Sequence, residues 1–392
     1  MNQTKKNYLI IFVFSLFLYT FYFLRNSNVP FIGMDSYYFA NHIFLGTNLH
    51  VTGIVGQFIM GLMPQSVIGI KIIMFLVTLT TLFIAYECAR LYSKKHALIY
   101  PLSLISFITY GLIFFKFEDD LFALPFLFLS LYFVIKKQLS KNNNKFFDKN
   151  IIFSLFFLFI STMIWKYTVL FILLYLFITR FNYLYILASS IFIIFWTDFI
   201  GSIFPHSQIA ENTSAFLSLN ISGGIILLLI FLYLKKSMIQ ENKLGIYVFS
   251  LLTLINFKII YVLTPILLLN NTTLLKNVSD KGKKGIYMIW FLFLIGMLSQ
   301  IIISPPSIQD YEVIRVGQSI ENNNISDVDY SWGIGYFVMW HNIDTEYFGS
   351  PPNKEIEYKN KFFVSRKGNK DLSNCLIVKD GKWFSLYDCR FL

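Results

Sequence analysis

Asp35 is an acidic residue whose surroundings point to chemistry. It lies in the segment Gly33-Met34-Asp35-Ser36-Tyr37-Tyr38, among aromatic residues and just after the first hydrophobic segment. A carboxylate so close to hydrocarbon is costly unless it is hydrated, paired or bound to a metal ion. Two interpretations stay open for this segment alone: the start of an interfacial helix within an aromatic belt, or a ligand for a divalent cation.

Further acidic residues occupy polar connections between apolar segments. They are Glu118, Asp119 and Asp120, which precede an apolar segment, and Glu211. Carboxylate oxygens suit Mg²⁺ or Mn²⁺, and an ion of this kind could neutralise a phosphate leaving group. A carboxylate without metal could activate an acceptor as a base. The triplet could also cap the helix expected from Leu121, because acidic side chains are favourable near a helix N-terminus.

The composition predicts the fold class. Of 392 residues, 56% are hydrophobic, 19% aromatic and only 14% charged, and apolar runs long enough to cross a bilayer recur. The chain is therefore expected to be a polytopic α-helical membrane protein. Its formal net charge of +11 comes from basic clusters between the apolar runs, so we attribute it to membrane topology and expect no nucleic acid partner.

The apolar runs predict about eleven spans. Their approximate bounds are 8–24, 66–87, 97–115, 121–135, 151–164, 167–179, 183–200, 223–234, 244–257, 259–270 and 285–303. Several are shorter than the roughly 20 residues of a full crossing, so some could be paired half-spans. Lysine clusters occur in every second connection, which predicts a cytoplasmic N-terminus. On that topology Asp35, the acidic triplet and Glu211 all face the outer side.

The chain divides into an apolar region, 1–303, and a polar tail, 304–392. Short alternating segments in the tail, with Asp380-Gly381 as a hairpin turn, predict a small extracytoplasmic domain that is α/β or mainly β. Cys375 and Cys389 would face an oxidising compartment and could pair. They are not opposite each other in a simple two-residue hairpin, so pairing would need an irregular turn. The sequence leaves the pairing open.

These motifs resemble those of the membrane glycosyltransferases of superfamily C (GT-C), most of all the archaeal form of the oligosaccharyltransferase catalytic subunit. In that family an aspartate of the first outer loop, often in an Asp-x-x-Tyr setting, contacts the metal and the acceptor, and the Asp35 segment resembles it. A second acidic motif opens the fourth span, where Glu118-Asp119-Asp120 lies. A Thr-Ile-x-Glu motif supplies a glutamate, and Gln208-Ile209-Ala210-Glu211 is similar, with Gln208 replacing the threonine.

Two further family motifs have partial counterparts. A basic residue near the end of a late span contacts the lipid pyrophosphate, and Lys258 resembles it as a point charge without the arginine fork; an ordinary snorkelling lysine is the alternative. A Trp-Trp-Asp-Tyr-Gly motif reads the acceptor, and the segment 329–336 resembles it in part through Trp332 and Tyr336. The tryptophan pair is not intact, and the chain is shorter than full-length members.

The resemblance implies an enzyme, a membrane glycosyltransferase that uses Mn²⁺ or Mg²⁺. It would transfer a sugar or oligosaccharide from a polyprenyl (dolichol) phosphate or pyrophosphate to a protein, glycan or lipid acceptor on the outer face. The catalytic set implied is Asp35, Glu118, Asp119, Asp120 and Glu211, of which Asp35, Asp120 and Glu211 would bind the metal.

Three other functions stay open. One is a transferase of the same superfamily that uses a monosaccharide polyprenyl phosphate and acts on a glycan or lipid. Another is a lipid or solute transporter, which predicts charged residues within the bundle and inverted repeats. The last is a non-catalytic membrane scaffold, which would not require Asp35 or Glu211.

Overall fold

The computed structural model describes part of the chain, and the statements below concern that part. The described residues are 2–25, 31, 34–45, 54–106, 112–140, 148–172, 175, 184–188, 264–269, 284, 285, 287, 288, 291, 295, 315–320, 322–325, 328–330, 362–367, 372–381 and 384–390. The spans predicted at 223–234 and 244–257 lie outside them, as do Glu211, Lys258, Trp332 and Tyr336.

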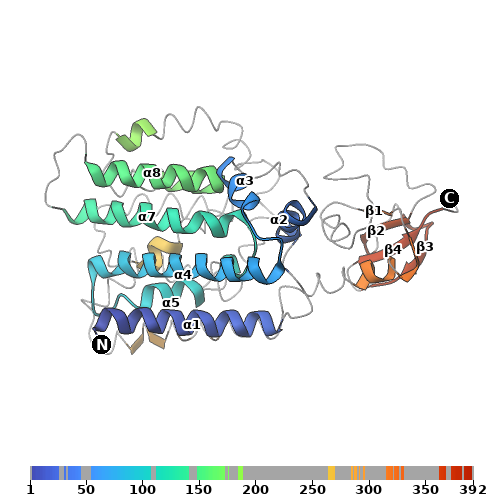
Figure 1. The fold of residues 1–392 in the computed structure, drawn as a ribbon, viewed down its shortest axis with the longest axis horizontal. Helices are drawn as coiled ribbons and strands as arrows, with labels where there is room; N and C mark the ends of the chain where they lie inside the picture. Colours follow the sequence, from blue (N-terminus) through green and yellow to red (C-terminus); the bar gives the residue numbers. More distant parts are fainter. Residues whose placement is uncertain are drawn as a thin grey trace.

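The first half of the chain is a bundle of helices that lie side by side (Figure 1). In chain order the elements are α1 (Gln3–Arg25), α2 (Met34–Leu45), α3 (Ile54–Gly61), α4 (Val67–Tyr92), α5 (Ile99–Ser106), η1 (Leu112–Phe115), α7 (Asp119–Leu139), α8 (Lys149–Ile164) and η2 (Lys166–Val169). The helix α7 packs between α4 and α8, and α1 packs against α4. The predicted spans 8–24, 66–87, 121–135 and 151–164 each correspond to one continuous helix.

Two described helices are long and apolar enough to cross a membrane, Gln3–Leu24 and Val67–Tyr92, and α8 is a shorter apolar helix. Their outward faces carry large apolar side chains, among them Val13 and Phe17 on α1, Ile68 on α4 and Phe156 on α8. In water an apolar surface of this extent is unfavourable, whereas hydrocarbon accommodates it. The architecture is mostly helical with a small C-terminal sheet, and the number of eleven spans stays a prediction.

Small polar side chains join the helices in the bundle interior. The hydroxyl group of Tyr19 on α1 hydrogen-bonds to Thr78 on α4 at 2.6 Å and donates to the carbonyl of Phe114. Between α7 and α8, the hydroxyl oxygens of Ser130 and Ser154 lie 3.0 Å apart. Contacts of this kind are typical of helices that pack in lipid, where apolar burial alone does not hold them together.

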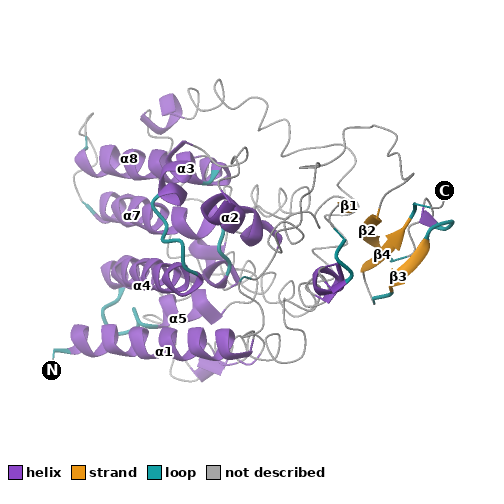
Figure 2. Cartoon of the chain, turned by 45° about the vertical axis from the view of Figure 1, so that its right-hand side comes forward, coloured by secondary structure: helices purple, strands orange, loops and turns teal. Residues whose placement is uncertain are grey.

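The bundle has two distinct ends. At the first, which we call the α1-start end, Asn7 donates to the hydroxyl of Tyr86 at 3.0 Å, so α1 begins where α4 finishes. An ion pair joins Lys137, near the end of α7, to Asp148, the N-cap residue of α8, with 2.8 Å between Nζ and Oδ2. At the opposite end α1 and α8 finish and α4 and α7 begin. Because α2 lies there (Figures 1 and 2), we call it the α2 end.

The described part of the tail contains a four-stranded sheet of β1 (Val328–Tyr330), β2 (Phe362–Arg366), β3 (Leu376–Lys379) and β4 (Phe384–Asp388). The strand order is β1-β2-β4-β3. The strand β1 runs parallel to β2, while β4 is antiparallel to both β2 and β3. Figures 1 and 2 show the sheet on the side of the bundle where α2 lies.

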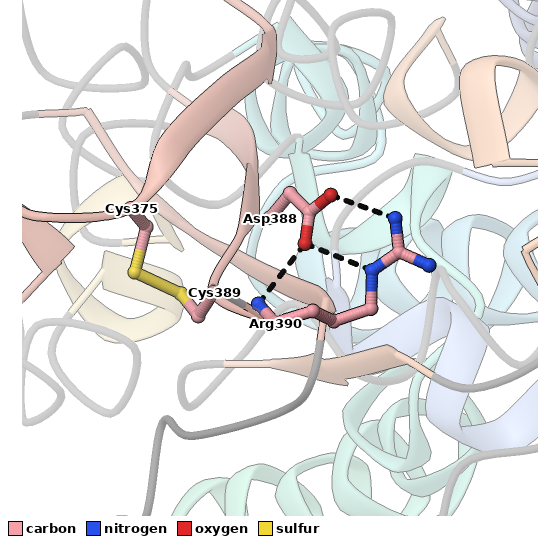
Figure 3. Close-up of a disulfide and its surroundings, with 4 residues drawn as sticks. All are labelled: Cys375, Asp388, Cys389 and Arg390. Carbon is pink, nitrogen blue, oxygen red and sulfur yellow. Dashed lines mark hydrogen bonds and ion pairs between the residues drawn. A yellow bond between two sulfur atoms is a disulfide. The ribbon is translucent and has the colours of Figure 1, made fainter. Parts of the chain in front are cut away.

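The hairpin of β3 and β4 explains how the two tail cysteines meet. Ile377 pairs with Tyr387, but Lys379 pairs with Leu386, so the register shifts between these rungs. A simple Asp380-Gly381 turn would not produce this register. The longer, irregular connection places Cys375 opposite Cys389, and the two form a disulfide with 4.6 Å between their Cα atoms (Figure 3). The pairing that the sequence left open is therefore present.

Arg390 secures the strand end beside the disulfide. Its backbone amide and its Nε each donate to Oδ1 of Asp388 at 3.0 Å, and its Nη2 donates to Oδ2 at 2.8 Å (Figure 3). These hydrogen bonds hold the pKa of Asp388 below its ordinary value. The guanidinium also lies 4.1 Å from the ring centroid of Phe362 on β2. The disulfide and this ion pair together fix the last strand of the sheet.

Replacing Lys137 with Met should lower the free energy of unfolding by about 2–3 kcal/mol, because Asp148 would keep a nearly buried charge without its cation. The side chains of the pair are only 9% and 11% exposed. The measurement is thermal unfolding in detergent. Lys367→Met is the matched control, since it removes the exposed Lys367–Asp380 pair, and its effect should be too small to resolve. Equal losses in the two variants would contradict the prediction.

The stability difference between wild type and Lys137→Met should also depend on pH. Burial raises the pKa of Asp148, but hydrogen bonds from Lys137 and from the Asn150 amide outweigh it and lower the pKa overall. A lowered folded-state pKa stabilises the protein above the unfolded-state value of about 3.9, and this stabilisation is lost as the pH falls through the folded-state pKa. The difference between wild type and Lys137→Met should therefore shrink below about pH 4.

Candidate functional site

The helix α2 has one buried face, which fixes how it lies against the bundle. Ser36, Phe39, Ala40 and Ile43 are all buried, and their spacing of three and four residues places them on one side of a helix. The hydroxyl oxygen of Ser36 accepts a hydrogen bond from the backbone N–H of Phe117 at 3.1 Å. The first turn of α2 is therefore held against the connection that leads into α7.

Phe117 is the centre of an aromatic cluster at this point. Its ring centroid lies 5.5 Å from that of Phe31, 6.3 Å from that of Phe39 and 5.9 Å from that of Phe122. These rings come from Phe31, three residues before the start of α2, from α2 itself and from α7. Because Phe117 is almost fully buried, the cluster orders two segments that are about 80 residues apart in the chain.

Asp35 directly precedes Ser36 and belongs to the first turn of α2. The hydrogen bond from Phe117 to Ser36 thus places the backbone of Asp35 beside the segment Lys116–Asp120. The side chain of Asp35 lies outside the described residues, and so does all of Glu211. The structure brings together two of the three acidic segments that the sequence singled out, and a shared ion among their carboxylates stays a prediction.

The acidic triplet opens α7 two residues before the expected start at Leu121. Glu118 occupies the N-cap position, but its side chain makes no capping hydrogen bond; its Oε1 lies 3.4 Å from Nζ of Lys116. Asp119 and Asp120 belong to the first turn, where the helix dipole favours acidic side chains. Capping therefore accounts for the position of the two aspartates but not for the side chain of Glu118, which lies beside Lys116.

Burial makes this segment electrostatically unusual. Glu118 and Asp120 are both 9% exposed. In Asp120, which precedes the span predicted at 121–135, burial raises the pKa well above its ordinary value, and the charges of Glu118 and Asp119 raise it further. Lys116 and the hydrogen bond from the Leu121 amide offset this only in part. Carboxylates crowded in this way attract a cation.

The described side chains can be compared with the metal site that the sequence predicts. Among the described side chains, no group of three or more His, Cys, Asp or Glu residues is arranged to hold an ion. Of the predicted ligands Asp35, Asp120 and Glu211, only Asp120 has a described side chain. Its oxygens, and those of the neighbouring Glu118, are the hard donors that Mg²⁺ and Mn²⁺ prefer, so the donor type agrees with such an ion, and its binding stays a prediction.

Sequence reasoning missed Ser36 and Phe117, which position the acidic segments. Between the predicted spans 8–24 and 66–87 the sequence left an interfacial helix at Asp35 open, and the structure contains two helices there, α2 and α3. The helical spacing of Ser36, Phe39, Ala40 and Ile43 was the available signal. The motif that was expected to bind the acceptor begins in β1, which contains Asp329 and Tyr330; Trp332 and Tyr336 lie outside the described residues.

The comparisons with known proteins add no relative. No protein-family model matches the chain, and no curated protein matches it significantly in sequence.

Replacing Ser36 with Ala should destabilise the α2 end by about 1–2 kcal/mol, because the buried N–H of Phe117 would lose its acceptor. Ser140→Ala is the matched control. The hydroxyl of Ser140 donates to the carbonyl of Lys137 at 2.8 Å in a partly exposed position, where water can replace it. Thermal unfolding of both variants in detergent tests the prediction, and it is wrong if Ser36→Ala costs no more than Ser140→Ala.

Proposed function

We propose that this protein is a membrane transferase that moves a sugar or oligosaccharide from a polyprenyl phosphate or pyrophosphate donor to an acceptor. The reaction would take place at the α2 end, assisted by Mn²⁺ or Mg²⁺. One observation carries the proposal: the hydrogen bond from Phe117 to Ser36 holds the turn that contains Asp35 against the acidic segment Glu118–Asp120. These are two of the acidic motifs on which the GT-C resemblance rests.

The distribution of charge supports an outward-facing α2 end. Basic residues gather at the α1-start end, where the described ones are Lys5, Lys6, Arg90, Lys94, Lys95, Lys136, Lys137 and Lys149. Fewer lie at the α2 end, namely Arg25, Lys71, Lys116 and Lys166. Because cytoplasmic ends carry the excess of Lys and Arg, the α1-start end would be cytoplasmic in a GT-C-like bundle of about eleven spans.

The tail supports the same orientation. Disulfides persist in oxidising compartments and are rare in the cytosol, and Cys375 is bonded to Cys389. The sheet that contains them lies on the α2 side of the bundle (Figures 1 and 2). An extracytoplasmic tail and an extracytoplasmic acidic site are therefore mutually consistent.

The acidic segments would perform two tasks. Asp35, Asp120 and Glu211 would hold the ion that neutralises the donor phosphate as it departs. In the transfer, the bond between the anomeric carbon and the phosphate oxygen breaks, the phosphate leaves with the electron pair, and the acceptor bonds to the anomeric carbon. A carboxylate of the set, Glu118 or Asp119, would accept the proton that the acceptor loses. Lys258 would contact the donor phosphate, and Trp332 and Tyr336 the acceptor.

The position of the acids favours a transferase over a transporter. The acidic residues in the described helices and their N-caps lie near the two ends of the bundle. Asp35 and 118–120 are at the α2 end, and Glu87 and Asp148 are at the α1-start end. A transporter that couples ions or protons is expected to carry acids near the middle of the bundle. A scaffold would not require carboxylates to be buried together, since burial costs stability.

The transferase is tested with purified protein, radiolabelled polyprenyl-linked sugars, and Mn²⁺ present or removed by chelation. Asp35→Asn and Asp120→Asn should each lower transfer by about 100-fold or more. Asp380→Asn is the control, because Asp380 is an exposed carboxylate on the sheet, and it should keep wild-type transfer. Thermal unfolding of each variant separates loss of chemistry from loss of fold. Undiminished transfer by Asp35→Asn would refute the proposal.

The orientation is tested with a membrane-impermeant maleimide added to intact cells. Cys375 and Cys389 are disulfide-bonded, so the reagent should label them only after reduction. Cys88 is buried in the bundle and should stay unlabelled in both conditions. Labelling of the tail cysteines without reduction would argue against the disulfide, and labelling that requires permeabilised cells would reverse the orientation.

A further inference from the structure

Lys71 is a cation inside a helix that could cross a membrane. It lies four residues after the start of α4 at Val67, which corresponds to about 6 Å along the axis at 1.5 Å per residue. A charged side chain in such a segment is costly unless an anion or water compensates it. The function proposed above gives Lys71 no role.

The surroundings of Lys71 are apolar and partly open. Its Nζ lies 4.7 Å from the ring centroid of Phe23, near the end of α1. Neighbouring side chains are strongly exposed: Leu24 by 69%, Ile68 by 73% and Ile72 by 54%. These side chains form the outward surface of α1 and α4 at the α2 end, where acyl chains would pack in a bilayer.

Two other described lysines of the bundle lie beside an acidic residue. Lys116 lies beside Glu118, and Lys137 pairs with Asp148. Lys71 forms no ion pair with any described residue, and the first turn of α4 contains no acidic residue. The positive end of the α4 dipole adds to the charge of Lys71 rather than offsetting it.

We propose that Lys71 binds the phosphate of an anionic lipid at the α1–α4 surface of the α2 end. A lysine one turn inside a span reaches the headgroup region by extending its four-carbon stem, and phosphate is the anion available at that depth. The ring of Phe23 holds the ammonium group through a cation–π contact. Leu24, Ile68 and Ile72 supply the surface for the acyl chains of the same lipid.

Two sources carry this chemistry, a phospholipid of the bulk bilayer and a polyprenyl phosphate. Only the second rests on the function proposed above. A lysine that merely avoids hydrocarbon would respond equally to zwitterionic and anionic lipids, whereas a phosphate-binding lysine should favour lipids with net negative charge. The preference for anionic over zwitterionic lipid is therefore the quantity to measure.

The experiment measures thermal unfolding of the full chain in nanodiscs of phosphatidylcholine alone, with added phosphatidylglycerol, and with added undecaprenyl phosphate. Wild type should gain about 2–4 °C in Tm with an anionic lipid. Lys71→Met should lose this gain, and Lys71→Arg should keep it. The matched control is Lys136→Met, because Nζ of Lys136 lies 5.8 Å from the ring of Tyr132 at the other end of the bundle; this variant should also keep the gain.

The outcomes separate the sources and the alternatives. A gain only with phosphatidylglycerol assigns the site to bulk phospholipid, a gain only with undecaprenyl phosphate assigns it to the polyprenyl lipid, and a gain with both indicates recognition of phosphate itself. The proposal is overturned if neither lipid raises Tm, if Lys71→Met keeps the gain, or if Lys136→Met loses as much. The phosphatidylglycerol measurement involves no polyprenyl donor and none of the acidic residues, so a failed transferase assay would not decide the matter.

Discussion

Hydrocarbon supplies no hydrogen-bond partners, and the described bundle is organised around that constraint. Some hydroxyl groups inside it bond to a neighbouring helix, as Tyr19 does with Thr78 and Ser130 with Ser154, and others bond to a carbonyl of their own helix, as Thr81 and Thr162 do. Charged side chains collect at the two ends, where they find partners such as the Lys137–Asp148 pair. The nearly buried carboxylate of Asp148 has the cation of Lys137 at 2.8 Å, so nearly buried carboxylates that lie beside one another are informative in this protein.

The α2 end differs from the rest of the bundle in the burial of its acidic side chains. Three consecutive acidic residues open α7, and two of them, Glu118 and Asp120, are nearly buried. A cap would need only one short side chain, and the N-cap residue Glu118 makes no capping bond. The structure also anchors the turn that contains Asp35 to the same segment through Ser36 and the ring cluster of Phe117. Stability that is given up locally in this way is common where a site must attract a cation.

The sequence predicts the parts of this fold that follow from composition and periodicity. Long apolar runs located α1, α4, α7 and α8, and alternation with a turn signal located β3 and β4. It could not predict the Cys375–Cys389 disulfide, because the register depends on the shift between Ile377 and Lys379. For the Asp35 segment it left a helix start open as one of two interpretations, and it did not predict that α2 packs against the connection before α7. The contact between Ser36 and Phe117 depends on how α2 packs, which short-range patterns do not contain.

One order of binding would explain both the acidic segment at the α2 end and the nearby Lys71. The acidic segment would attract a divalent cation, while Lys71 and the start of α4 would attract an anion on the outward surface. Donors of the proposed kind carry a phosphate and are delivered from the bilayer, so they meet the lipid-facing surface of the protein before its interior. A phosphate that is weakly held at Lys71 could be exchanged for the stronger combined charge of a metal ion and its carboxylates. This order of binding requires the cation on the lipid-facing surface and the acids in the interior, as Lys71 and Asp120 are arranged.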